Sequence, residues 1–107
     1  MLNNFYRSFE DKYRGSREVI KARLEVYIPF IETMKLTQDR LKIIDLGCGR
    51  GEWLELLIEN DCDVIGVDLD EGMLQDCIQR GFNVKQQDAI EELKSLNDNS
   101  ISIVTGF

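Results

Sequence analysis

The chain has 107 residues, of which 43% are hydrophobic and 31% are charged, and its formal net charge at pH 7 is -7. This composition predicts one small globular domain and excludes a wholly disordered or collagen-like chain. No apolar run approaches the roughly 18 residues of a membrane-spanning helix, and the N-terminus lacks the pattern of a secretory signal. We therefore expect a cytoplasmic protein without a transmembrane segment.

Residue types narrow the possible chemistry. The chain has no histidine, which excludes Ser-His and Cys-His catalytic pairs and any His-ligated metal. Its three cysteines form no Cys-x-x-Cys pair, so we expect buried thiols and no metal site. Residues 1–42 hold 9 basic and 6 acidic side chains (+3), whereas residues 43–107 hold 4 and 14 (-10). The acidic second half disfavours nucleic acid and suits a ligand with a positive centre.

Residues 1–42 are expected to form an N-terminal helical arm or cap. The first 15 residues show no regular period and predict one short helix at most. Ser16 is placed to cap a helix whose apolar residues recur at helical spacing from Ile20 to Ile31. Pro29 interrupts this pattern, so either the helix kinks or a second short helix begins at the proline.

Residues 43–107 alternate between short apolar strands and amphipathic helices. The second helix ends at Gly81, which matches a left-handed glycine cap, and the third is indicated by Ile90, Leu93 and Leu96. Strands are predicted at 43–46, 64–67, 83–86 and 101–105. Such alternation predicts an α/β fold, a Rossmann-like doubly wound parallel sheet, preceded by a helical extension.

A glycine-rich turn, Gly47-Cys48-Gly49-Arg50-Gly51, joins the first strand to the first helix. Glycines let the backbone approach a ligand closely and present backbone amides at the start of the helix. Dinucleotide-binding turns place a third glycine where this chain has Glu52, whose carboxylate would meet the pyrophosphate. An NAD-dependent oxidoreductase is therefore the weaker alternative.

Acidic side chains follow the next two strands. Asp68 comes 21 residues after Gly47, the offset at which a carboxylate accepts hydrogen bonds from ribose hydroxyls. Asp88 occupies the equivalent end of the third strand, where a carboxylate can also cap the following helix. A nucleoside-containing ligand accounts for both positions.

These motifs together resemble class I S-adenosylmethionine-dependent methyltransferases. Residues 43–51 are similar to the first motif of that family, 67–70 to its acidic second motif, and 87–89 to the stretch that brackets the adenine. Residues 5–30 also resemble the lead-in of bacterial methyltransferases associated with surface-polysaccharide assembly.

The resemblance implies S-adenosyl-L-methionine as cofactor and methyl transfer, by the full-length form, to an unidentified acceptor such as a glycan or a small molecule. Arg17 would reach the carboxylate of the ligand. The alternative interpretation is that Arg17 is an exposed arginine in the first turn of its helix. Trp53 and Met73 are expected to pack in the core. The cofactor-binding residues that the resemblance implies are Asp45, Gly47, Cys48, Gly49 and Gly51 at the methionine end, Asp68 at the ribose, and Leu69, Asp88 and Ala89 at the adenine.

The family is expected to have a seven-stranded sheet, and this chain stops at the fourth strand. We therefore expect the chain by itself to be inactive, with its catalytic residues unknown, and to self-associate through the uncovered sheet edge. The main alternative function is a non-catalytic module that binds a nucleoside or S-adenosylmethionine. The domain division that follows is an arm at 1–42 and a partial cofactor-binding domain at 43–107.

Overall fold

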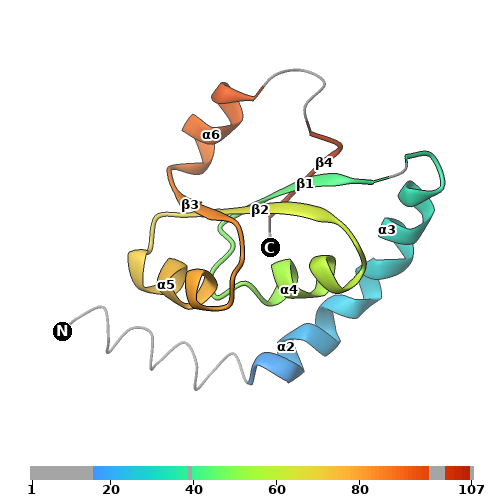
Figure 1. Ribbon diagram of the computed structural model, residues 1–107, viewed down its shortest axis with the longest axis horizontal. Helices are drawn as coiled ribbons and strands as arrows, with labels where there is room; N and C mark the ends of the chain where they lie inside the picture. The colour runs from blue at the N-terminus through green and yellow to red at the C-terminus, as the bar shows by residue number, and fades with distance from the viewer. Residues whose placement is uncertain (1–15, 39, 97–100, 107) are drawn as a thin grey trace.

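The computed structural model describes residues 16–38, 40–96 and 101–106. The arm expected before residue 16, with its part of the lead-in pattern, lies outside these residues. Four parallel strands form one sheet in the order β3-β2-β1-β4, and helices lie on both faces of it (Figure 1). The predicted Rossmann-like α/β fold is confirmed.

The strands are β1 (Lys42–Leu46), β2 (Asp63–Asp68), β3 (Val84–Gln86) and β4 (Ile103–Thr105). The central strand is β1, in which Ile44 stands opposite Ile65 of β2 and Val104 of β4. The fourth strand is shorter than predicted and begins at Ile103. Ser102 forms a bend instead, because its hydroxyl accepts a hydrogen bond from the Lys42 amide at 3.2 Å and donates one to Gln38 at 2.8 Å.

Two helices, α4 (Glu52–Glu59) and α5 (Glu71–Gln79), lie on one face of the sheet, and α6 (Ala89–Ser95) lies on the other (Figure 1). Trp53 of α4 and Met73 of α5 are 4% and 7% exposed, so both are core residues as predicted. The predicted cap of α5 is present, because Gly81 has a φ of +82° and the Phe82 amide bonds to the Cys77 carbonyl.

The predicted third helix is also present, but it buries a charged residue. Glu92 is 1% exposed, whereas Ile90 and Leu93 are 62% and 45% exposed. The ammonium of Lys85 on β3 lies 2.6 Å from Glu92 Oε2, in an ion pair whose angles do not make a hydrogen bond. This neutralising partner is what permits a carboxylate at a buried position.

Three short N-terminal helical segments follow one another before the sheet, and the first of them packs against α4. They are α2 (Arg17–Leu24), the 3-10 turn η1 (Glu25–Tyr27) and α3 (Ile28–Lys35). The Ser16 hydroxyl accepts a hydrogen bond from the Val19 amide, which confirms the predicted cap. Pro29 stands in the first turn of α3, where its missing N–H costs no helical hydrogen bond. Within the described residues, the helices are too short or too polar to span a bilayer.

Candidate functional site

The carboxyl ends of the strands are where this sheet topology would place a ligand. The chain leaves β1 through α4 to reach β2 on one side, while β4 lies on the other side of β1. Open α/β sheets bind ligands in the crevice at such a switch point. A cavity of 220 Å³ lies at these ends, lined by Gly47, Val67, Asp68, Leu69, Gln87, Asp88 and Ala89. Five of the predicted site residues, from three separate segments of the chain, therefore meet in one cavity.

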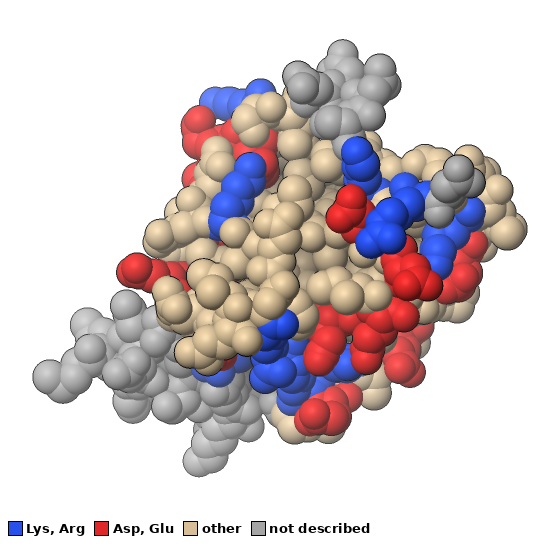
Figure 2. All heavy atoms as spheres, viewed as in Figure 1, with Lys and Arg blue, Asp and Glu red and all other residues tan. Residues whose placement is uncertain are grey.

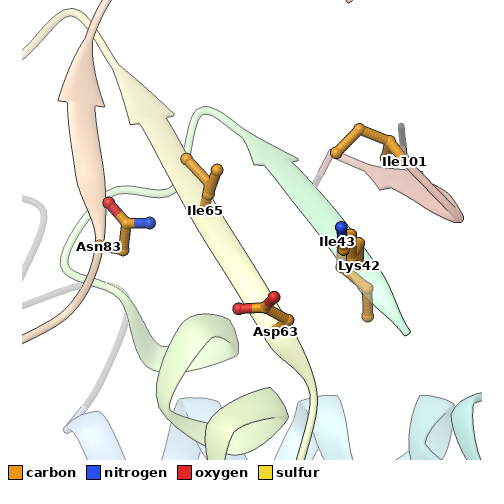
Figure 3. A pocket seen from close by; sticks show the side chains of 6 residues that line it. All are labelled: Lys42, Ile43, Asp63, Ile65, Asn83 and Ile101. Atoms are coloured by element: carbon orange, nitrogen blue, oxygen red, sulfur yellow. The ribbon is translucent and has the colours of Figure 1, made fainter. Parts of the chain in front are cut away.

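A larger cavity of 270 Å³ lies at the other end of the sheet. It is lined by Lys42 and Asp63, at the starts of β1 and β2, together with Ile43, Ile65, Asn83 and Ile101 (Figure 3). Because ligands of doubly wound sheets bind at the carboxyl ends of the strands, the smaller cavity is the candidate site.

The glycine loop after β1 has the backbone conformation that its sequence requires. Gly47, Gly49 and Gly51 have φ values of +73°, +58° and +83°, a region in which residues other than glycine are strained. The amides of Gly47 and Cys48 both donate to the Val67 carbonyl, at 2.7 and 3.0 Å. The loop is thus tied to the end of β2, next to the cavity.

Asp68 joins the glycine loop to the cavity. Its Oδ2 accepts a 2.8 Å hydrogen bond from the Gly49 amide, and its Oδ1 accepts one of the same length from the Asp70 amide. A carboxylate has about four lone-pair directions, so these two bonds orient the group and leave acceptor capacity for ligand hydroxyls.

Asp88 caps α6, and the capping leaves one of its oxygens available. Oδ1 accepts hydrogen bonds from the amides of Ile90 and Glu91, at 2.9 and 3.2 Å. Oδ2 takes part in neither bond and can accept from an amino group in the cavity. Leu69, which is 62% exposed, and Ala89 supply apolar surface to the same cavity.

Asp45 is a buried carboxylate at the end of β1, 3% exposed. Its pKa is raised to about 6, mainly because burial disfavours the charged form; a hydrogen bond from Thr105 lowers the pKa and the nearby charge of Asp68 raises it. Thr105 Oγ1 donates to Asp45 Oδ1 at 2.7 Å and accepts from Trp53 Nε1 at 3.2 Å. Thr105 was not among the predicted residues, although its place at the end of the strand next to β1 was a usable signal.

Cys48 faces the core beneath the loop. Its Sγ lies 2.8 Å from where a Cβ at Gly66 would stand, so only glycine fits there. A hydrogen bond with the Cys77 thiol and burial both raise the pKa of Cys48. The thiol therefore stays protonated at neutral pH. Cys48 does not line the cavity, and its predicted place at the methionine end of the ligand stays a prediction.

Arg17 differs from the exposed first-turn arginine that was one alternative, because its side chain is only 13% exposed. The guanidinium bonds to Glu55 of α4 and to the backbone carbonyls of Arg50 and Gly51. It thus reaches the glycine loop, but none of these residues lines the cavity. The predicted contact with a ligand carboxylate stays a prediction.

Several solved structures similar to this chain are described as methyltransferases. One from Archaeoglobus fulgidus, described as an SAM-dependent methyltransferase, is 47% identical, with a TM-score of 0.80 over 94% of this chain. CalS10, an amino pentose methyltransferase from Micromonospora echinaspora, is 21% identical, with a TM-score of 0.61 over 94% of this chain. The bifunctional kinase-methyltransferase WbdD is 16% identical, with a TM-score of 0.69 over 78% of this chain. The last two likenesses concern the fold alone.

The aligned part covers 42%, 41% and 21% of the Archaeoglobus, CalS10 and WbdD chains, so this chain spans less than half the length of each. A comparison with functionally curated proteins found no match. The resemblance to class I methyltransferases, drawn from three motifs, is confirmed by the 47% identical relative. The sequence model of the family described as methionine biosynthesis protein MetW matches residues 29–105, and the chain therefore belongs to that family.

Proposed function

We propose that this chain binds S-adenosylmethionine and is the cofactor-binding part of a methyltransferase. The observation that carries the proposal is the convergence of the glycine loop, Asp68 and Asp88 on one cavity at the carboxyl ends of the strands. The Archaeoglobus relative, at 47% identity, is described as dependent on the same cofactor. When bound, S-adenosylmethionine supplies a methyl group already activated by its sulfonium charge.

Each polar group at the site has a defined task in this proposal. The remaining lone pairs of Asp68 accept the ribose hydroxyls, and Asp88 Oδ2 accepts the adenine amino group, with Leu69 against the ring. The glycine loop, where no Cβ intervenes at Gly47 or Gly49, lies along the methionine part. Asp45 supplies negative charge behind the loop, which favours a ligand with ammonium and sulfonium charges.

Transfer from an activated sulfonium depends mainly on holding the acceptor nucleophile in line with the methyl group. The similar structures are described with different acceptors, an amino pentose for CalS10 and plantazolicin for BpumL. A shared fold with different acceptors means that the acceptor must be found by experiment. We propose a glycan or a small molecule as its class, and the resemblance of residues 5–30 to polysaccharide-associated methyltransferases supports the glycan.

The binding part of the proposal is tested by calorimetric titration of the chain with S-adenosylhomocysteine. We expect saturable binding at one site, weakened at least tenfold by Asp68→Ala. Asp63→Ala is the matched control, because Asp63 begins the same strand at its far end and is expected to leave the affinity unchanged. Equal affinity of the native chain and Asp68→Ala would contradict the assignment of the ribose site.

The same titration, repeated in the presence of NAD, distinguishes the proposed function from the NAD-dependent alternative. Glu52 begins α4 and is 5% exposed, so a pyrophosphate at the start of this helix would approach a carboxylate held within the fold. We expect NAD at millimolar concentration to leave bound S-adenosylhomocysteine in place. Displacement by NAD with comparable affinity would favour the oxidoreductase.

Self-association through the sheet edge is a second, independent part of the proposal. Among the described strands β4 pairs only with β1, and its Val104 is 45% exposed. Beside it, Phe30 and Tyr27 of the N-terminal helices are 74% and 43% exposed and line an apolar groove of 310 Å³. We expect sedimentation velocity to show dimers at micromolar concentration and Val104→Lys to return the chain to a monomer.

A further inference from the structure

The side chain of Arg17 crosses from the first residue of α2 to the glycine loop, 33 and 34 residues further along the chain. Its Nη1 donates to the Arg50 carbonyl at 2.9 Å and its Nη2 to the Gly51 carbonyl at 3.2 Å. Its Nε donates to Glu55 Oε2 at 3.0 Å. All three guanidinium nitrogens are thus committed to the loop and to the helix that follows it.

The two carbonyls that Arg17 holds determine the direction of the neighbouring amides. In a planar trans peptide the C=O of one residue and the N–H of the next point in opposite directions. Fixing the Arg50 carbonyl therefore orients the Gly51 amide, which donates to the Cys48 carbonyl at 3.0 Å and closes the loop. Fixing the Gly51 carbonyl orients the Glu52 amide at the N-terminus of α4, the end of a helix that favours negative ligand groups.

The surroundings keep the Arg17 guanidinium in place. Its central carbon lies 5.9 Å from the centre of the Phe82 ring, which packs against Gly51. Burial raises the pKa of Glu55, but the bonds and charges of Arg17 and Lys21 outweigh that effect, so the pKa is lowered and the carboxylate stays ionised. Acidic and basic side chains lie next to one another over α2 and α4 (Figure 2).

One further hydrogen bond connects the glycine loop to the cavity: the Gly49 amide donates to Asp68 Oδ2 at 2.8 Å. Arg17 itself does not line the cavity, and neither do Arg50 and Gly51. Movement of the loop end would therefore displace the amide that orients the Asp68 carboxylate.

From these contacts we infer that Arg17 is a positioning residue that holds the glycine loop in its ligand-binding shape from outside the cavity. The inference rests on the proposed binding of S-adenosylmethionine and replaces the direct contact with the ligand carboxylate that the sequence suggested. A planar fork with donors on three nitrogens matches two carbonyls and a carboxylate at once, which the single ammonium of lysine cannot do.

Two ligands and three variants test the inference. S-adenosylhomocysteine carries the amino-acid carboxylate and decarboxylated S-adenosylhomocysteine lacks only that group, so their affinities separate loop positioning from direct contact. The variants are Arg17→Gln, Arg17→Lys and the control Lys21→Gln. Lys21 bonds to Glu55 at 3.3 Å and to Glu59 at 3.0 Å, so the control removes one charge from the same network while the guanidinium bonds to the loop remain.

We expect Arg17→Gln to lower the affinity for both ligands about tenfold. Lys21→Gln is expected to lose a similar amount of thermal stability but to change neither affinity by more than twofold. Arg17→Lys is expected to recover stability without recovering affinity. Loss of affinity for S-adenosylhomocysteine alone would show direct contact with the carboxylate and overturn the inference. The inference would also be overturned if Arg17→Gln left both affinities unchanged, or if the loss of affinity followed the loss of thermal stability across all three variants.

Amide hydrogen exchange of the ligand-free chain provides a test that does not depend on binding. The Gly51 and Glu55 amides, which donate to the carbonyls of Cys48 and Gly51, are expected to exchange at least tenfold faster in Arg17→Gln than in Lys21→Gln. If the native chain binds neither ligand, the proposed function fails while this measurement still decides whether Arg17 orders the loop. Equal exchange in the two variants overturns the ordering role.

Discussion

Thr105 stands directly opposite Asp45 in the pairing of β4 with β1, and its hydroxyl donates a 2.7 Å hydrogen bond to the buried Asp45 carboxylate. The two residues are 60 positions apart in the chain. This bond joins β1 to the edge strand β4 at the switch point of the sheet, where the nearby charge of Asp68 also raises the pKa of Asp45. Asp45 and Thr105 therefore connect the stability of the sheet to the electrostatics of the site.

Asp45 makes the stability of the chain depend on pH. Because burial raises its pKa from 3.8 to about 6, its contribution to stability is present below pH 3.8 and is lost as the pH rises through 6. The full loss corresponds to at most about 3 kcal/mol. We expect Asp45→Asn to be more stable than the native chain above pH 6.5, with the difference vanishing near pH 4. Urea unfolding at a series of pH values measures it, and parallel curves for the two proteins would refute the prediction.

Replacing Thr105 with valine keeps the shape of the side chain and removes its hydroxyl. The buried carboxylate loses its donor and Trp53 Nε1 loses its acceptor, so the free energy of unfolding at pH 7 should fall by about 1–3 kcal/mol. Thr105→Ser, which keeps the hydroxyl, is the control. In the Asp45→Asn background the same replacement should cost less, since the two residues interact. Strictly additive losses in chemical denaturation would argue against the coupling.

Gly51 and Gly81 form a matched pair of glycines, with φ values of +83° and +82°. A Cβ at Gly51 would lie 2.9 Å from Cys77 Sγ and 3.0 Å from Phe82, whereas a Cβ at Gly81 would meet nothing within 4 Å. Gly81→Ala should therefore cost only the left-handed strain of about 1 kcal/mol, and Gly51→Ala about 1–3 kcal/mol more. Adding Cys77→Ala to Gly51→Ala should recover part of the loss. Equal unfolding midpoints for the two single variants would contradict the packing argument.

The Lys85–Glu92 ion pair is unequally buried, with side-chain exposures of 45% and 1%. Removing the lysine with Lys85→Met leaves a buried charge without its partner and should lower the free energy of unfolding by about 3 kcal/mol at pH 7. Adding Glu92→Leu, which places an apolar residue of similar size at the buried position, should restore most of that loss. Thermal unfolding of the two variants measures these changes. If the pair behaved as a surface ion pair, Lys85→Met alone would lower the free energy of unfolding by less than about 1 kcal/mol.

The fold could be predicted from local patterns because each signal for it lies within a short stretch of the chain. Apolar runs of strand length, the glycine loop and the cap at Gly81 each depend on neighbouring residues. The start of β4 could not be predicted from local patterns, because Ser102 bonds to residues 60 and 64 positions away. Likewise, the apolar residues that marked α6 correctly indicated a helix but not which side of it faces the sheet, since burial of Glu92 depends on Lys85 of another element.

The sequence by itself determined which side chains follow the strands, and hence that Asp68, Asp88 and the glycine loop share one edge of the sheet. A parallel α/β sheet brings its carboxyl ends together whatever the other residues are. Only the tertiary structure decided that Thr105 bonds to Asp45 and that Arg17 holds the loop at Arg50 and Gly51. Those contacts join residues 33 to 60 positions apart, and no periodicity encodes which distant groups meet, because that follows from how the helices and strands pack together.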